Sequence, residues 1–405
     1  MKKKLFAGML AGLVLTAALM SGCGIVSRSE LPAGETAAAT ASPTESTGSP
    51  AATAAVTESG AYTARDLAQN ADESEAKTLT VSDGETATIT EAGVYLLSGS
   101  AKEAQVVVAA GSEDKVQLVL AGLHIANTDK ACILVQSADK VFLTSVEGSE
   151  NSLTVSGKFL GDEDAVIFSR DDLVLNGLGA VTISSSGDGV RCNDDLKLTG
   201  GTWKVTAEDT ALKAHDSILA WDGSYELTAG SDGLHAEDSD DDTTGYIAFD
   251  GGSFVIRAGD DGIHATTTAT VNGGDLTVSA AEGIEATQVI LNDGVIRITA
   301  TDDGVNAGKK SKSLSVKIEV NGGSLTIAMG QGDTDGIDSN GDLIITGGVI
   351  DITGQSPFDY DGSCTYTGGT IIVNGQETDT ITNQMVGGPM GHTGGPGGGF
   401  GGKHG

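Results

Sequence analysis

The sequence predicts an all-β fold, a single-stranded parallel β-helix with three short strands in each rung of about 21 residues. A motif of acid, glycine, aliphatic residue and polar residue recurs, with Gly262, Gly283 and Gly304 spaced 21 residues apart. A second landmark, a Gly-Gly or Asp-Gly pair, recurs in phase with the first, and apolar residues alternate with polar ones around each pair. Such alternation is typical of strands with one buried face, and a repeat of this kind is typical of a solenoid.

Each repeat contains three candidate strands in a fixed order. In one copy they are GIHA at 262–265, ATVNG at 269–273 and DLTVSA at 275–280. Ile263 and Ala265 are expected to point into the core, and His264 outward. A β-propeller would need about 40 residues per blade, and a leucine-rich repeat would need a leucine and asparagine consensus that this chain lacks.

Acidic residues stand directly before the repeated glycine and in the outward column beside it. Stacked rungs would bring these carboxylates close together, which is unfavourable unless a cation lies between them. Oxygen ligands suit Ca²⁺, which takes 6–8 of them at about 2.3–2.6 Å. The predicted calcium ligands are Asp209, Asp232, Asp260, Asp261, Glu282, Glu285, Asp302, Asp303, Asn306, Asp335 and Asp338. The alternative is that the acids cap turns and keep the edge soluble.

Three residues in outward columns are predicted to contact a ligand. They are His235 and His264, which stand beside the acids, and Trp221, whose column otherwise contains Thr, Asp and Asn. An indole on a polar column is suited to stacking on a sugar ring. The alternative for Trp221 is that it covers a loop.

The chain of 405 residues has a formal net charge of −33. Such a chain repels phosphates, so a nucleic-acid partner is not expected, and cations are its natural ligands. A monomer is expected.

The two ends of the chain differ from the repeat. Residues 1–22 resemble a lipoprotein signal peptide, with lysines at positions 2–4 and the sequence LMSGC ending in Cys23, the predicted lipidation site. An ordinary secretory signal is the alternative. Residues 23–76 are predicted to be a disordered Ala/Thr/Ser-rich linker, residues 77–385 the β-helix, and residues 386–405 a disordered glycine-rich tail.

The segments Thr88–Asn127 and Ala138–Gly157, with the DDG and NGG motifs, resemble a family of secreted carbohydrate-binding proteins from cellulose-degrading clostridia. The resemblance covers residues 77–375. It implies a right-handed parallel β-helix similar to pectate lyases, bound calcium, and binding to cellulose and to acidic sugars such as pectin fragments. Lyase activity is not implied. By the same resemblance, the calcium ligands of the related lyase fold match the Asp-rich corners here, chiefly Asp260, Asp261, Asp302, Asp303, Asp335 and Asp338.

The expected function is therefore that of an extracellular carbohydrate-binding lipoprotein, anchored to the bacterial membrane by its N-terminal lipid alone. Its expected partners are cellulose and polygalacturonate. Two alternatives stay open. A calcium-dependent pectate lyase would need a base, and Lys213, outward beside the acids, is the candidate. A structural adhesion protein would use calcium for rigidity. No catalytic residue is expected otherwise.

Overall fold

The computed structural model describes residues 61–330 and 334–383, which form one 34-stranded sheet. Its strands pair in parallel, except that β33 (Thr370–Val373) pairs antiparallel with β34 (Gln376–Thr378). The predicted all-β class is confirmed, and the sheet is consistent with a parallel β-helix. The predicted signal peptide, the predicted lipidation site Cys23 and the predicted tail lie outside the described residues. Within the two described ranges no helix is long and apolar enough to span a bilayer.

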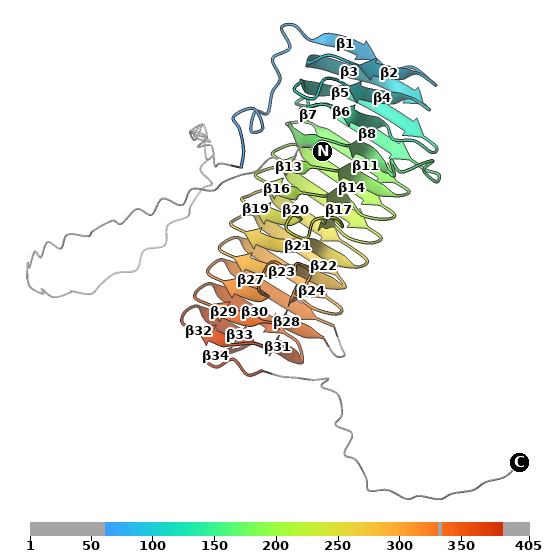
Figure 1. Cartoon of the computed structure of the whole chain (residues 1–405). Helices are drawn as coiled ribbons and strands as arrows, with labels where there is room; N and C mark the ends of the chain where they lie inside the picture. Colours follow the sequence, from blue (N-terminus) through green and yellow to red (C-terminus); the bar gives the residue numbers. More distant parts are fainter. Residues whose placement is uncertain (1–60, 331–333, 384–405) are drawn as a thin grey trace, which may run out of the picture. The chain divides into compact units, whose positions relative to one another are not determined.

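The strands pair along three ladders, stacked in sequence order from β1 to β34 (Figure 1). The first ladder contains β2 (Thr86–Ile89), β4 (Gln105–Ala109), β6 (Ile133–Ser137), β9 (Ala165–Ser169), β12 (Asp188–Cys192), β15 (Leu212–Ala214), β18 (Leu234–Ala236), the first parts of β21 (Asp261–Val271) and β23 (Glu282–Leu291), β25 (Val305–Ala307), β28 (Asp335–Ser339) and β31 (Ser356–Tyr360).

The second ladder contains β1 (Lys77–Thr80), the first parts of β3 (Gly93–Lys102) and β5 (Lys115–Asn127), β7 (Lys140–Ser145), β10 (Asp172–Gly177), β13 (Asp195–Leu198), β16 (Ser217–Ala220), β19 (Tyr246–Phe249), the second parts of β21 and β23, β26 (Lys317–Val320), β29 (Asp342–Ile345) and β32 (Cys364–Tyr366).

The third ladder contains the second parts of β3 and β5, β8 (Glu150–Val155), β11 (Ala180–Ser185), β14 (Thr202–Ala207), β17 (Ser224–Ala229), β20 (Ser253–Arg257), β22 (Asp275–Ala280), β24 (Val295–Ala300), β27 (Ser324–Met329), β30 (Val349–Thr353), β33 and β34.

Apolar side chains from all three ladders meet in one continuous core. Residues alternate between buried and exposed along strands such as β22 and β24, as period-two patterning requires. Trp203 and Tyr225 are each 1% exposed, and the rings of Tyr225 and Phe254 stack at 4.7 Å. Like residues therefore lie on like along the core, and the polar atoms of the Trp203 and Tyr225 rings donate to the backbone carbonyl of Gly200.

Two kinds of glycine are required by the stacking. A Cβ on Gly262 would lie 2.6 Å from the carbonyl oxygen of Gly283, the equivalent glycine in the neighbouring strand. Gly274, the second residue of a Gly-Gly pair, has a φ of 93°, a conformation that glycine adopts readily. The close approach of neighbouring strands therefore requires the first landmark, and a turn requires the second.

The ordered structure begins before the boundary predicted at residue 77. Residues 61–69 run along the second ladder, where the first blue segment of Figure 1 lies beside β7 and β13. Asp66 is fully buried and forms ion pairs with Lys140 and Lys197. This part of the predicted linker is instead packed on the sheet, because two buried lysines need its carboxylate.

Candidate functional site

The outward residues of the first ladder form one line, here called the polar column. Its members lie side by side in register: Arg191, Lys213, His235, His264, Glu285, Asn306, Asp338 and Asp359. Paired strands lie about 4.8 Å apart, so consecutive members can interact. Cationic side chains occupy one end of the column and oxygen acceptors the other.

His264 lies where the two halves of the polar column meet. Its Nδ1 is 2.6 Å from Asp261 Oδ2 and 2.9 Å from Glu285 Oε2. Glu285 also forms an ion pair with Lys310, with 2.5 Å between Oε1 and Nζ. His264, Asp261 and Glu285 could together hold a metal ion, since one ligand atom from each lies within 4.8 Å of the others.

These contacts change the proton affinities of all three groups. Burial alone would lower the pKa of His264, but the bonds to Asp261 and Glu285 outweigh it and raise that pKa to about 10. Burial would raise the pKa of Glu285, but His264 and Lys310 lower it to about 2. Burial raises the pKa of Asp261 to about 6 despite His264, because Glu285 adds a like charge. Glu285 is thus the carboxylate that stays ionised beside the imidazolium.

His235 stacks on His264, with 4.5 Å between the ring centroids and 4° between the planes. Its Nδ1 is 2.7 Å from Asp232 Oδ2, and its Nε2 is 3.1 Å from Glu237 Oε2. The two imidazoles are therefore held in the same orientation by the acids that precede their glycines, Asp232 and Asp261.

The corner acids also accept backbone hydrogen bonds from the neighbouring strand of the ladder. The amides of Thr210 and Asp261 donate to Asp188 Oδ1 and Asp232 Oδ1, each at 3.0 Å, and the amide of Asp335 donates to Asp303 Oδ1 at 3.1 Å. The turn-capping alternative therefore applies to these carboxylates.

The doubled acids of the motif fall into two environments. Asp209, Asp260 and Asp302 are exposed, whereas Asp232 and Asp261 are buried. The predicted ligands that the structure brings together are thus the acids next to glycine and those of the polar column.

Carboxylates crowd the acidic end of the polar column. Burial raises the pKa of Asp338 to about 7, with Asp303, Asp335 and Asp359 adding to the effect. Burial, with like charges nearby, raises the pKa of Glu282 to about 7 and that of Asp303 to about 6. These pKa values indicate a place that lacks positive charge.

Two buried oxygens at this end have no hydrogen-bond partner within the described part of the chain. They are Asn306 Oδ1 and Asp359 Oδ1. The Asn306 amide group faces Glu282, because its Nδ2 donates to Glu282 Oε2 at 2.9 Å. Buried acceptors without a donor are costly, and a cation would satisfy them.

A second acidic group lies where the first ladder turns into the second. Burial raises the pKa of Asp194 to about 7, with Asp172, Asp216, Asp171 and Asp195 contributing. These residues were not among the predicted ligands. The signal was present in the sequence as RDD, NDD and AHD at 170–172, 193–195 and 214–216.

Trp221 is half-buried against the N-terminal segment. Its ring meets that of Tyr62 edge-on, with 5.4 Å between the centroids, and it packs with Leu67 and Leu219 in a small apolar cluster. This contact favours the alternative that the tryptophan covers a loop, and its stacking on a sugar stays a prediction.

Lys213 lies in the polar column between Arg191 and His235. No ion pair joins it to Asp209 or Asp232 among the described residues. Burial raises the pKa of Asp188, and the charge of Lys213 offsets part of that rise. Its two neighbours in the column are a cation and an imidazole. Among the described residues it therefore lacks a paired acid that would position it as a base.

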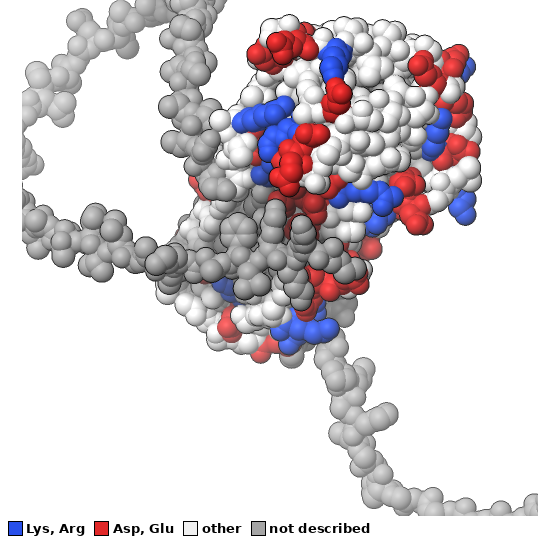
Figure 2. All heavy atoms as spheres, turned by 45° about the horizontal axis from the view of Figure 1, so that its top comes forward, with Lys and Arg blue, Asp and Glu red and all other residues white. Residues whose placement is uncertain are grey.

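The surface charges are mixed on the face that Figure 2 shows. Asp and Glu side chains gather next to Lys and Arg in several groups, separated by wide uncharged areas. Exposed pairs such as Lys204 with Glu226 and Arg297 with Asp275 are of this kind. Such pairs contribute little to stability, about 0–1 kcal/mol each.

The fold and this column define a repetitive all-β protein with a candidate cation-binding edge. Residues 83–334 match the family described as carbohydrate-binding domain-containing protein. The chain belongs to this family.

One relative and one solved structure are similar to parts of the chain. A carbohydrate-binding domain-containing protein of Acetivibrio thermocellus is 38% identical over 127 residues, which are 29% of this chain and 44% of that protein. The chain thus spans less than half the length of this relative. A polysaccharide lyase-like protein from C. thermocellum, solved as a gadolinium derivative, is 30% identical with a TM-score of 0.49, covering 55% of this chain and 96% of that one.

Four residues of the site were missed from the sequence. Glu237 and Lys310 lie outside the repeated motif, in segments between strands. Asp359 continues the polar column past Asp338, but Pro357 replaces the glycine of the motif there. Counting the column one repeat further would have found Asp359. Asp194 follows the outward column rather than preceding the glycine.

Proposed function

We propose that this chain is a lipid-anchored, extracellular protein that binds plant-wall polysaccharide, either cellulose or acidic sugars such as pectin, through a calcium-loaded β-helix. In this proposal the helix is right-handed, with three strands per rung of about 21 residues. Membership of the carbohydrate-binding family supports the class of ligand. The remaining support comes from the acidic end of the polar column.

The crowded oxygens at this end carry the calcium part of the proposal. Among the described residues no donor reaches the buried Asn306 Oδ1 and Asp359 Oδ1, and the pKa of Asp338 beside them is raised to about 7, by burial first and then by Asp303 and Asp335. Carboxylate and amide oxygens from neighbouring strands are the ligands that Ca²⁺ prefers. A bound cation removes both costs, since it neutralises the like charges and satisfies the acceptors.

Calcium also explains how an acidic protein binds an acidic polymer. With a formal net charge of −33 the chain repels polygalacturonate. A Ca²⁺ ion with positions open toward solvent accepts a uronate carboxylate as a further ligand. Binding to acidic sugars is then calcium-dependent, whereas binding to neutral cellulose is not.

Co-precipitation with polygalacturonate tests this function. We expect wild-type protein to pellet with the polymer in Ca²⁺, and to stay in solution in EDTA or Mg²⁺. The double variant Asp303→Asn, Asp338→Asn is expected to bind at least about tenfold more weakly, because amides do not neutralise Ca²⁺. Asp293→Asn, at an exposed turn bonded to the amide of Gly294, is the matched control. Binding that is equal in EDTA, or equal in both variants, would contradict calcium bridging.

The same tubes distinguish binding from catalysis. We expect no unsaturated sugar product, since within residues 61–330 and 334–383 no carboxylate is bonded to Lys213 that would position it as a base. A calcium-dependent product that disappears in Lys213→Ala would make the protein a lyase. The anchor is tested separately, because Cys23→Ala should move the protein from the membrane fraction to the soluble fraction.

A further inference from the structure

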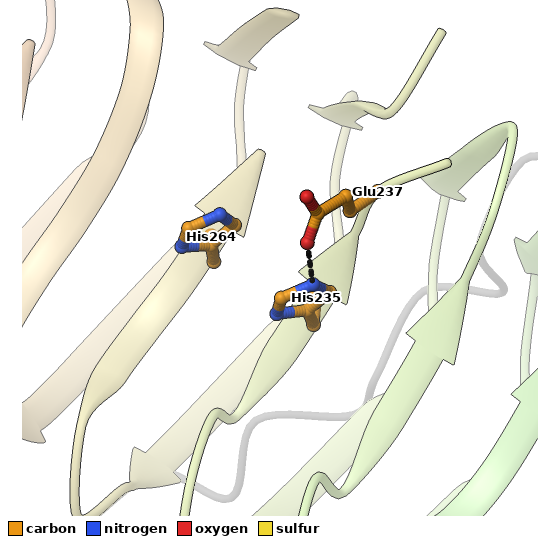
Figure 3. Close-up of side chains that lie close together, drawn as sticks. All are labelled: His235, Glu237 and His264. Carbon is orange, nitrogen blue, oxygen red and sulfur yellow. Dashed lines mark hydrogen bonds and ion pairs between the residues drawn. The ribbon is translucent and has the colours of Figure 1, made fainter. Parts of the chain in front are cut away.

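His235, His264 and Glu237 form a group that the calcium proposal does not use. One ligand atom from each lies within 4.8 Å of the others, and Figure 3 shows the two rings parallel, with Glu237 reaching back toward the edge of His235. We propose that these three side chains bind a divalent transition-metal ion of the Zn²⁺ class through the two imidazole Nε2 atoms and the Glu237 carboxylate.

The orientation of the rings supports this assignment. Each Nδ1 is already occupied, that of His235 by Asp232 at 2.7 Å and that of His264 by Asp261 at 2.6 Å. Nε2 is therefore the nitrogen that each ring can offer to a metal, and that of His235 already faces Glu237, the third proposed ligand. A carboxylate on the far nitrogen is the usual partner of a metal-bound histidine, because it fixes the ring and raises the basicity of the ligating nitrogen.

The geometry of the group fits a small ion. Zn–N distances are about 2.0–2.1 Å, so two ligand atoms of one ion lie about 3–4 Å apart. The Nε2 of His235 lies 3.1 Å from Glu237 Oε2, and the rings are 4.5 Å apart. A small movement of the Glu237 side chain, which is 48% exposed, completes the set.

The ligand atoms decide which ion is bound. Imidazole nitrogen suits Zn²⁺, Cu²⁺ and Ni²⁺, whereas Ca²⁺ prefers oxygen alone. Three protein ligands leave a position open, as in zinc sites that take a water or another ligand. The neighbouring acids Asp232, Asp261 and Glu285 offset the ion's charge, whereas Lys213, the next member of the column, opposes it.

This inference does not rest on the proposed function. The calcium ligands are oxygens at the other end of the polar column, around Asp303 and Asp338. A protein without calcium or polysaccharide binding could still bind Zn²⁺ here, and the reverse also holds.

Titration of the full chain with Co²⁺, followed by displacement with Zn²⁺, tests the site. The glycine-rich tail contains His392 and His404, so the background is the His392→Asn, His404→Asn variant without an affinity tag. We expect one equivalent of Co²⁺ with visible absorption bands typical of nitrogen coordination, and their loss when Zn²⁺ is added. A 100-fold excess of Ca²⁺ should leave the bands unchanged.

Substitutions in the same background identify the ligands. Glu237→Gln should weaken binding about tenfold or more, and His264→Gln should abolish the bands. His124→Gln is the control, because His124 bonds Ser152 Oγ and belongs to another ladder. Circular dichroism and the melting temperature report whether each variant is folded, and Glu237→Gln, at a half-exposed side chain, is the informative variant if His264→Gln unfolds. No bands, bands equal in Glu237→Gln and wild type, or displacement by Ca²⁺ would each overturn the proposal.

Discussion

His264 shows how a single residue sets the charge of this edge. Its imidazole is bonded to Asp261 and Glu285 through one nitrogen, and stacks on His235. Burial opposes its charge, but two carboxylates outweigh burial, so that its pKa is raised to about 10. A histidine in this position is a fixed cation at neutral pH, unless a metal ion takes the place of its proton.

The first prediction concerns the pH dependence of stability at this residue. Because the pKa of His264 is higher in the folded chain than its ordinary value of 6.5, its charge stabilises the fold fully below pH 6.5. That stabilisation is lost as pH rises toward 10. We expect the unfolding free energy of wild type to fall over this range by an amount on the order of a few kcal/mol, and that of His264→Gln to fall less. Denaturant titrations at several pH values in EDTA measure it, and parallel curves for the two proteins would contradict it.

Trp221 provides the second prediction at this scale. Its contact with Tyr62 assigns it to holding residues 61–69 on the sheet. Trp221→Ala should leave polysaccharide binding unchanged and loosen the chain around Arg65, which is exposed and lies over the ring of Phe142 in the intact protein. Limited trypsin digestion should then cleave after Arg65 several-fold faster. Lost binding with unchanged cleavage would instead support the sugar-stacking role.

The N-terminal segment is the element whose attachment depends most on one side chain. Asp66 receives a hydrogen bond from the amide of Thr63 and ion pairs from Lys140 and Lys197. Burial would raise the pKa of Asp66, but the Thr63 amide and the two ammonium groups hold it below its ordinary value. Both lysine side chains are themselves largely buried, so none of the three charges is satisfied by water.

Asp66→Asn should therefore destabilise the protein by about 3–5 kcal/mol, the usual cost of leaving buried charges without their partner. The effect should be largest above pH 4, since a carboxylate with a lowered pKa stabilises the fold above its unfolded pKa and loses that effect in acid. Chemical denaturation checks this, with Glu73→Gln, an exposed residue just after the segment, as the control. Equal stability of the two variants would mean that the segment is not part of the folding unit.

The repeat explains which elements the sequence could predict. Aligning the motif glycines puts Ile263 with Ile284, and Val305 with Ile337, and the parallel register pairs the same residues. Within a solenoid each residue is determined by the equivalent residue next to it, so that alternation and spacing suffice. One difference is that β21 and β23 each run through two of the predicted strands, with a shift in their mutual register between Ala265 and Thr268.

Contacts between residues outside the repeat could not be predicted in this way. The partners of Asp66 are Lys140 and Lys197, and Lys310 reaches Glu285 from a segment between two strands. None of these pairs follows from a spacing, because nothing in the sequence aligns them. The sequence therefore predicted which acids share an edge, but not that Asp261 and Glu285 share one imidazole.

For the whole molecule, the distribution of charge matters more than its sum. The formal net charge is −33, yet the carboxylates whose pKa is raised to about 7 lie at two places, around Asp338 and around Asp194. Stacking parallel strands makes this unavoidable, since an acid at one position of the repeat recurs beside its own copies. The fold thus concentrates like charge along its edges, and stability becomes dependent on whatever neutralises it.

The last prediction follows from the sign of these shifts. Burial and neighbouring acids raise the pKa values of Asp338, Glu282 and Asp194 to about 7 each. A group whose folded pKa is raised stabilises the fold below its unfolded pKa and loses that effect as pH rises through the folded value. Without calcium, the melting temperature should therefore be lower at pH 8 than at pH 5. Ca²⁺ should restore the melting temperature at pH 8 better than Mg²⁺. At 100 times its Kd a bound ion adds about 2.7 kcal/mol to the unfolding free energy. The effect of Ca²⁺ should be smaller at pH 5, where protons already neutralise these groups. Melting curves in EDTA, Ca²⁺ and Mg²⁺ at the two pH values measure this, and an EDTA effect of equal size at both would show that the stabilising cation binds elsewhere.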